Sequence, residues 1–184
     1  MKKHSIAIIG GGSWATAIVK ILSVNCDSIN WWVRKKDTVD FIKKFKHNPT
    51  YLSDVEFDLK KVFVSDDLKS VLKNASIIIL AVPSAFLKGT LSKISPADLK
   101  DKIIFSAIKG IVPDDLMIVG DFMNRKYKIP VDKIGVITGP CHAEEVAMEK
   151  LSYLTIACQN TEHAKSLAEF MNCRFIKTTV SDDI

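Results

Sequence analysis

The amino-acid sequence predicts an α/β fold in which a mostly parallel sheet carries helices on both faces. Short runs rich in β-branched residues alternate with segments of helical periodicity, which is typical of strand–helix–strand units. Several of these runs are apolar at every position, as expected for strands covered on both sides. The chain has 184 residues, 47% of them hydrophobic, which suits one domain with one core. The expected strands span residues 5–10, 28–33, 62–64, 76–82, 102–107, 133–138, 153–158 and 174–178.

Helical periodicity follows several of the expected strands. Apolar stripes at three- and four-residue spacing comprise Trp14, Ile18, Ile21 and Leu22, then Leu87, Leu91 and Ile94, then Ala164, Leu167 and Met171. Pro83, Pro113 and Pro140 each follow a strand or its loop, where proline can begin a helix. No repeat, linker or low-complexity segment interrupts this order, so we expect residues 1–184 to form a single domain.

Charge and composition argue against several classes of function. Lys and Arg outnumber Asp and Glu by 26 to 21, but the basic residues are scattered among acids, so we expect no nucleic-acid partner. The longest apolar run, 77–82, is far shorter than the ~18 residues that a membrane span needs. The apolar run before residue 10 is also too short for a signal peptide. Four cysteines without a C-x-x-C pair predict reduced thiols in a cytoplasmic protein, and neither they nor the histidines have metal-ligand spacing.

A glycine-rich turn directly follows the first expected strand. Residues 10–15, G-G-G-S-W-A, fit the pattern G-x-G-x-x-G/A at the junction between a strand and an amphipathic helix. Gly10 permits the tight turn, Gly12 lets the backbone approach a diphosphate, and Ala15 lets the helix pack closely on the sheet. The first N–H groups of the helix then face the phosphates. This pattern predicts a doubly wound, Rossmann-type sheet that binds a dinucleotide, although flavin and S-adenosylmethionine binders share the turn, and a plain turn is the simplest alternative.

The end of the second strand bears on the choice of cofactor. A carboxylate about 20 residues after the glycines would hold a ribose 2′-hydroxyl, but here Arg34, Lys35 and Lys36 precede the first acid, Asp37. Cations at this point suit a 2′-phosphate. We therefore predict that NADP is accepted in addition to or in place of NAD, with a solvated basic turn as the alternative interpretation.

Four further motifs follow the glycine turn in a specific order. They are N-P-T-Y-L at 48–52, A-V-P-S at 81–84, K-G-I at 109–111 and G-P-C-H-A-E-E-V at 139–146. Together with G-G-G-S-W-A, these motifs make the chain resemble the bacterial NAD(P)-dependent sn-glycerol-3-phosphate dehydrogenases over essentially all 184 residues. The resemblance is to the N-terminal cofactor-binding domain of that family.

The resemblance implies an activity and further parts of the enzyme. Such enzymes transfer a hydride reversibly between NAD(P)H and the pair dihydroxyacetone phosphate and sn-glycerol 3-phosphate, which supplies glycerophospholipid synthesis. A C-terminal helical domain, expected after residue 184, supplies the lysine that accepts the proton and an arginine for the substrate phosphate. We therefore expect a shortened chain that binds cofactor with little or no turnover, and a possible homodimer in the full-length enzyme.

Site residues follow from the motifs and the resemblance. Lys109 lies at the carboxyl end of an expected strand, where a cation can stabilise charge that develops on a ketone oxygen, and the resemblance places it on both cofactor and substrate. The resemblance assigns Gly139 and Cys141 to substrate, although most relatives carry Ser or Thr at the position of Cys141. The cofactor set comprises Gly10, Gly12, Ser13, Trp14, Arg34, Lys35, Tyr51, Pro83, Lys109 and Ala143, and Ser84 lies beside Pro83 on the nicotinamide side.

Other interpretations of these residues remain open or are weaker. Trp14 also fits a purely structural role on the apolar stripe. A Cys141–His142 nucleophile lacks a third orienting group, and Glu144 and Glu145 would diverge on a helix rather than form an acid/base pair. The alternative functions are another two-domain hydroxy-acid dehydrogenase and a non-catalytic module that binds a nicotinamide nucleotide.

Overall fold

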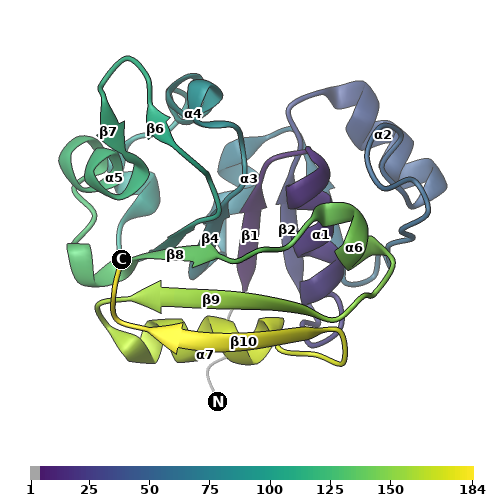
Figure 1. The fold of residues 1–184 in the computed structure, drawn as a ribbon. Helices are drawn as coiled ribbons and strands as arrows, with labels where there is room; N and C mark the ends of the chain where they lie inside the picture. The colour runs from purple at the N-terminus through teal and green to yellow at the C-terminus, as the bar shows by residue number, and fades with distance from the viewer. Residues whose placement is uncertain (1–4) are drawn as a thin grey trace.

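An eight-stranded sheet forms the centre of the molecule in the computed structural model, which describes residues 5–184 (Figure 1). The strand order is β10-β9-β8-β5-β4-β1-β2-β3. The strands are β1 Ile6–Ile9, β2 Ile29–Trp32, β3 Val62–Ser65, β4 Ile77–Leu80, β5 Ile103–Ser106, β8 Ile134–Thr138, β9 Ser152–Cys158 and β10 Ile176–Ser181. Neighbouring strands are parallel except for the pair β8–β9. The predicted fold class and all eight predicted strands are confirmed.

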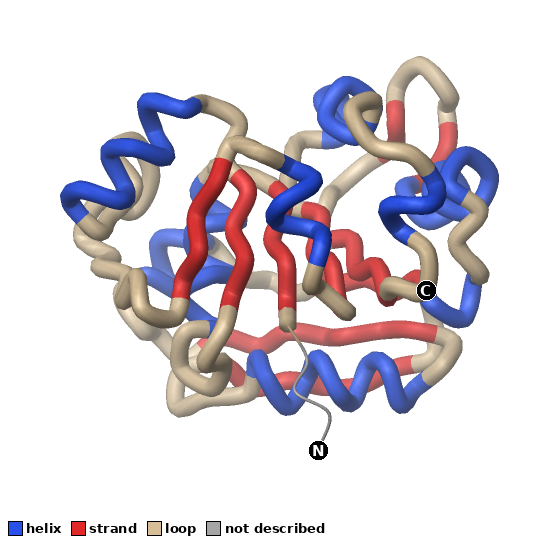
Figure 2. Tube along the Cα trace, turned by 180° about the vertical axis from the view of Figure 1, so that it is seen from behind, coloured by secondary structure: helices blue, strands red, loops and turns tan. Residues whose placement is uncertain are grey.

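Helices cover both faces of this sheet (Figures 1 and 2). The α-helices are α1 Ser13–Leu22, α2 Lys36–Phe45, α3 Leu68–Lys73, α4 Ser84–Leu91, α5 Val119–Tyr127, α6 Ala143–Ala147 and α7 Thr161–Met171, and the 3-10 turns are η1 Pro96–Leu99 and η2 Val131–Lys133. Within residues 5–184, no helix is both long enough and apolar enough to cross a bilayer.

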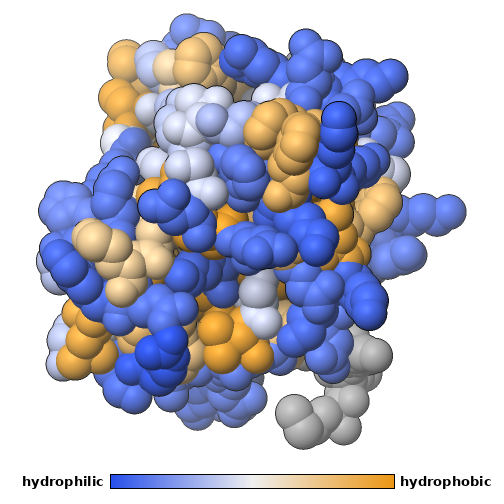
Figure 3. All heavy atoms as spheres, turned by 90° about the vertical axis from the view of Figure 1, so that its right-hand side faces the viewer, coloured by the Kyte–Doolittle hydropathy of each residue, from blue (hydrophilic) through white to orange (hydrophobic). Residues whose placement is uncertain are grey.

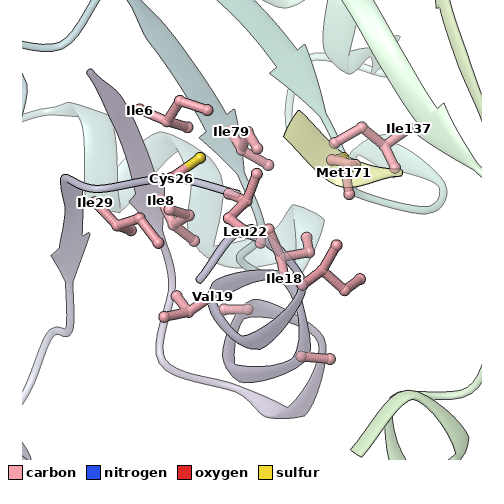
Figure 4. Close-up of a cluster of buried hydrophobic side chains, with 14 of the residues drawn as sticks. Ile6, Ile8, Ile18, Val19, Leu22, Cys26, Ile29, Ile79, Ile137 and Met171 are labelled. Atoms are coloured by element: carbon pink, nitrogen blue, oxygen red, sulfur yellow. The ribbon is translucent and has the colours of Figure 1, made fainter. Parts of the chain in front are cut away.

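Two hydrophobic clusters lie on opposite faces of the sheet, and β1 contributes to both. Ile6 and Ile8 point toward the cluster that contains α1 and α7, whereas Ala7 and Ile9 point toward the cluster that contains α3, α4 and α5. Figure 4 shows the first of these clusters, where Ile18 of α1 lies among side chains of the sheet. A strand alternates its side chains between faces, so a run that is apolar at every position can fill two cores at once.

One segment differs from the sequence-based expectation. Pro113 begins no helix, because it lies in the turn of a short antiparallel hairpin formed by β6 Ile111–Val112 and β7 Met117–Ile118. Helix α5 begins only after that hairpin, at Val119. The predicted stripe of Leu87, Leu91 and Ile94 is longer than its helix. Helix α4 ends at Leu91, and Ile94 is buried outside it.

The strand order creates a crevice at one edge of the sheet. From β1 the chain moves outward through β2 to β3, and then returns to place β4 on the other side of β1. The registers pair Ile9 with both Trp32 and Leu80, so the carboxyl ends of β1, β2 and β4 are level. Loops that leave adjacent parallel strands in opposite directions open a ligand crevice at this edge.

Gly10 is required for β1 and β4 to approach each other at this crevice. Its φ is +148°, a region that non-glycine residues rarely adopt, and an added Cβ would overlap the carbonyl oxygen of Ala81. Backbone strain and overpacking each cost on the order of 1–3 kcal/mol.

We expect Gly10→Ala to lower the free energy of unfolding by at least about 2 kcal/mol in chemical denaturation. Gly12→Ala is the matched control, because Gly12 has a φ of −83° and open space around an added Cβ. That control should change the free energy of unfolding by less than about 1 kcal/mol. Equal stability of the two variants would contradict the assigned role of Gly10.

Candidate functional site

The glycine turn after β1 is held by three side chains that donate to its carbonyl groups, and the backbone amide of Thr16 also donates to the Gly12 oxygen, at 3.0 Å. Trp31 Nε1 donates to the Gly10 oxygen at 2.6 Å, Asn48 Nδ2 donates to the Gly11 oxygen at 3.2 Å, and Thr16 Oγ1 donates to the Gly12 oxygen at 2.9 Å. The Trp31 ring is itself fixed, since it is fully buried with its centroid 5.1 Å from that of Phe57. All three carbonyl groups therefore have partners within the protein.

The amide groups of the same turn are free to bind a ligand. In residues 5–184, the N–H groups of Gly11, Gly12 and Ser13 donate no hydrogen bond. Helix α1 begins at Ser13, and its N-cap residue, Gly12, has no side chain to satisfy the first amides. Unsatisfied amides at a helix N-terminus, together with the helix dipole, attract a phosphate group.

A pocket of about 270 Å³ opens beside this turn at the crevice of the sheet. It is lined by Gly11, Gly12, Trp32, Val33, Arg34, Lys35, Thr38, Asn48, Thr50, Tyr51, Val82, Pro83, Phe86 and Thr90. The pocket thus brings together five of the predicted cofactor residues, namely Gly12, Arg34, Lys35, Tyr51 and Pro83. Those residues come from the ends of three different strands and from one loop.

One wall of the pocket is basic. Arg34 and Lys35 are both exposed, and in the described part of the chain no carboxylate forms an ion pair with either side chain. The Arg34 guanidinium lies 5.5 Å from the centre of the Phe86 ring, which belongs to α4 on the other side of the pocket. The face of the molecule on the side of α2 mixes hydrophilic side chains with small hydrophobic groups (Figure 3). Because Arg34 and Lys35 have no carboxylate partner among the described residues, both cations are free to meet an anionic ligand.

The position of Tyr51 depends on Asn48. The sequence singles out Asn48 only as the first residue of the motif N-P-T-Y-L. Asn48 Oδ1 accepts hydrogen bonds from the amides of Thr50 and Tyr51 at 3.0 and 3.2 Å. This folds the loop that follows α2 back against the pocket. Phe86 and Thr38 are further lining residues that the sequence did not single out, because nothing local distinguishes them from ordinary helix residues.

Several predicted residues lie outside the pocket lining. Gly10 is buried under the turn, and Ser13 is the first residue of α1. Trp14 is half-buried and packs against the cluster around α1. This packing is the structural role that its place on the apolar stripe offered as an alternative to cofactor contact. Ala143 is the first residue of α6, buried where α6 packs against α1.

The predicted substrate residues lie in loops that leave β5 and β8. Lys109 is exposed three residues beyond the end of β5. A Cβ added at the next residue, Gly110, would lie 3.9 Å from Ser84 Oγ, so this loop runs beside the start of α4. The side of the pocket formed by Pro83 and Ser84 therefore adjoins the loop of Lys109.

The loop after β8 is held against β9. Gly139 has a φ of +152°, and an added Cβ there would overlap the carbonyl oxygen of Tyr153. The Cys141 thiol donates to the same oxygen, with Sγ 2.9 Å away. The thiol proton is thus directed toward the backbone of β9. Among the described residues, no group of three His, Cys, Asp or Glu side chains could hold a metal.

Strand order, glycine turn and pocket together define the class of Rossmann-type, dinucleotide-binding domains. A family model described as the N-terminus of NAD-dependent glycerol-3-phosphate dehydrogenase matches residues 5–164, so the chain belongs to that family. The resemblance drawn from the motifs is therefore confirmed.

Individual relatives agree with the family assignment. The protein named glycerol-3-phosphate dehydrogenase (NAD(P)+) of Bacillus velezensis is 33% identical across 100% of this chain and 53% of its own length. The protein of the same name from Syntrophotalea carbinolica is 31% identical across 98% of this chain and 54% of its own. A crystal structure of glycerol-3-phosphate dehydrogenase from Coxiella burnetii matches 99% of this chain and 55% of that chain with a TM-score of 0.89 and 26% identity. The chain spans about half the length of the curated relatives it matches.

The surroundings of the four cysteines predict which thiols react in the folded protein. Burial raises the pKa of Cys26 to about 12 and also raises the pKa of Cys158, so both stay protonated at neutral and mildly alkaline pH. Cys141 and Cys173 are only half-buried.

Iodoacetamide labelling at about pH 8, read by mass spectrometry, should therefore modify Cys141 and Cys173 in the native protein and all four cysteines after denaturation. Modification of Cys26 at the rate of Cys141 in the native protein would contradict the described burial.

Proposed function

We propose that this chain binds the dinucleotide of an oxidoreductase that transfers a hydride between NAD(P)H and the pair dihydroxyacetone phosphate and sn-glycerol 3-phosphate. The observation that carries the proposal is the set of three free amides, at Gly11, Gly12 and Ser13, in a turn that borders a pocket with a basic wall at the crevice of the sheet. Membership of the glycerol-3-phosphate dehydrogenase family supports the choice of substrate. The nicotinamide supplies the hydride chemistry, and the protein supplies binding, orientation and charge.

Each end of the pocket has a separate task in this proposal. The amides of the glycine turn bind the diphosphate, because they are dipoles already aimed at the pocket. Arg34 and Lys35 bind the 2′-phosphate of NADP, since no carboxylate of the described residues competes for them. Pro83 and Ser84 place the nicotinamide toward the loop that carries Lys109.

Lys109 acts on the substrate oxygen in this proposal. When a hydride is added to the ketone carbon, negative charge develops on the oxygen, and a nearby ammonium group stabilises that charge. A proton delivered to the oxygen completes the alcohol. Gly139 and Cys141 border the substrate through the loop that β9 holds, and Ala143 borders the cofactor from the start of α6.

The proposal extends to the parent enzyme. We place its product in glycerophospholipid synthesis, its location in the cytoplasm, and its assembly as a homodimer. A helical domain after residue 184 would supply the remaining substrate contacts, because the curated relatives are about twice as long as the matched region. The chain of 184 residues is then expected to bind cofactor with little or no turnover.

Cofactor titration by intrinsic fluorescence tests the binding half of the proposal, since Trp32 lines the pocket. We expect NADPH to bind at least as tightly as NADH, and flavin adenine dinucleotide and S-adenosylmethionine to bind at least tenfold more weakly. The double variant Arg34→Gln/Lys35→Gln should weaken NADPH at least tenfold, because charge-assisted hydrogen bonds contribute roughly 1.5–3 kcal/mol each, and should change NADH less than threefold.

Lys43→Gln is the matched control for the lost charge, because Lys43 lies in the last turn of α2 and outside the pocket lining. It should leave both dissociation constants unchanged within threefold. A tenfold preference of the unaltered chain for NADH over NADPH would contradict the assigned role of Arg34 and Lys35.

Steady-state kinetics of the full-length enzyme test the catalytic half. Lys109→Ala should lower kcat/KM for dihydroxyacetone phosphate by at least about a hundredfold, because removal of one electrostatic donor to a developing oxyanion costs roughly 10²–10³ in rate. Lys100→Ala serves as the control, since Lys100 is exposed in the turn that precedes β5, at the opposite edge of the sheet from Lys109. Retention of activity within threefold by Lys109→Ala would refute this role.

A further inference from the structure

Asn48 is a fully buried polar residue whose hydrogen-bonding groups are all used. Its Nδ2 donates to the Gly11 oxygen at 3.2 Å and to Thr16 Oγ1 at 2.9 Å. Its Oδ1 accepts from the amides of Thr50 and Tyr51 at 3.0 and 3.2 Å. The side chain has 0% of its surface exposed, although the residues that follow it are exposed. Burying a side-chain amide costs free energy unless its polar atoms form hydrogen bonds. Here Nδ2 and Oδ1 both form hydrogen bonds to backbone groups of residues that line the pocket.

The donor end of Asn48 sets the direction of a neighbouring amide. A trans peptide unit is planar, so its carbonyl group and the following N–H point in opposite directions. When Asn48 holds the Gly11 oxygen inside the protein, the N–H of Gly12 must point the other way. By the same rule, Trp31 at the Gly10 oxygen orients the N–H of Gly11.

Thr16 completes this set of carbonyl contacts. The hydroxyl and the backbone amide of Thr16 both donate to the Gly12 oxygen, and the hydroxyl accepts from Asn48. These hydrogen bonds orient the N–H of Ser13. The three oriented amides are the same three that have no acceptor among the described residues. Three successive glycines would otherwise sample many conformations, and each such freedom is lost on binding at a cost in affinity.

The acceptor end of Asn48 holds the opposite wall. By binding the amides of Thr50 and Tyr51, it keeps the loop after α2 against the pocket. One buried side chain therefore connects the glycine turn, the first turn of α1 and the loop that carries Tyr51. An ionised acidic residue at this position could not donate to the Gly11 oxygen, because a carboxylate only accepts hydrogen bonds.

We propose that Asn48 is a positioning residue that holds the amides of the glycine turn in the geometry that binds the dinucleotide diphosphate. This inference rests on the proposed function, since it assumes a dinucleotide in the pocket. Asn48 acts through the backbone and through Thr16, and it need not contact the ligand. The predicted result of losing its donor is a selective loss of affinity for ligands that contain the diphosphate.

Asn48→Asp tests this inference because it removes the Nδ2 donor and keeps an oxygen acceptor for the loop amides. Dissociation constants for NADPH and ADP-ribose should each rise at least tenfold, measured well below the thermal midpoint of the variant. The constant for adenosine 2′-monophosphate, which lacks the diphosphate, should change less than threefold. Equal weakening of all three ligands, or no weakening of NADPH, would overturn the inference.

Asn124→Asp is the matched control for the chemical change. Asn124 Nδ2 also donates to a backbone oxygen, that of Ile129 at 2.8 Å, but it lies in α5 and outside the pocket lining. This variant should lower the thermal midpoint and leave every dissociation constant unchanged within threefold. A rise in the NADPH constant that matches that of Asn48→Asp would show that general destabilisation explains the effect, and would overturn the inference.

A second pair of variants applies if Asn48→Asp fails to fold. Thr16→Val removes the hydroxyl that binds the Gly12 oxygen and should weaken NADPH at least fivefold, whereas Thr16→Ser retains the hydroxyl and should bind within threefold of the unaltered chain. Equal affinities of Thr16→Val and Thr16→Ser would overturn the inference. If the unaltered chain binds NADPH but the Asn48 and Thr16 variants bind it equally well, the inference fails alone, and if the unaltered chain binds no dinucleotide, the proposed function fails with it.

Discussion

The close approach of β1 and β4 at Gly10 is the constraint on which the rest of the site depends. The backbone of Gly10 lies so near the Ala81 carbonyl group that no side chain fits between them, and the methyl group of Ala15 fills the space on the other side. These contacts fix where the chain turns and therefore where α1 begins. Because β2 pairs with β1 in register, Arg34 and Lys35 are brought to the same edge, two and three residues beyond the end of β2. The pocket is thus a result of strand pairing, and its residues need not be near one another in sequence.

In the proposed function, the site binds an anion chiefly with neutral dipoles. Charged side chains at the diphosphate would be costly to bury, whereas amide N–H groups carry partial charge at fixed positions and lose little hydration. Their direction must be enforced, since glycine alone permits many orientations. Here their direction is fixed by hydrogen bonds to the carbonyl group of each peptide. The side-chain donors are the indole of Trp31, the carboxamide of Asn48 and the hydroxyl of Thr16. The cations are left for the exposed end of the pocket, where hydration keeps the cost of an unpaired charge small.

Sequence reasoning succeeded where the signal is local and failed where it depends on tertiary contacts. The strands and the glycine turn were predictable because apolar runs and turn chemistry reflect local geometry and burial. The hairpin around Pro113 was missed because its two-residue strands are too short to show a period. Trp14 was placed in the cofactor set with core packing as the alternative, since one apolar stripe suits both roles, and in the structure it packs against the cluster around α1. Asn48 and Tyr51 were visible within a motif, but the place of Asn48 follows from hydrogen bonds to residues more than 30 positions earlier, which no local pattern records, and Tyr51 is in turn held by Asn48.

The geometry also separates cofactor binding from the chemistry of the substrate. Every residue that lines the pocket comes from the region between Gly11 and Thr90, and only Lys109 and Ala143 of the predicted cofactor residues come from later in the chain. Lys109, Gly139 and Cys141 instead lie in loops that follow later strands, and the loop of Lys109 runs beside Ser84 at the start of α4. A ligand can therefore use the amides and the basic wall without any contribution from the later loops. In the proposed function, substrate affinity and turnover depend in addition on the loops after β5 and β8, so they can change without a change in cofactor affinity.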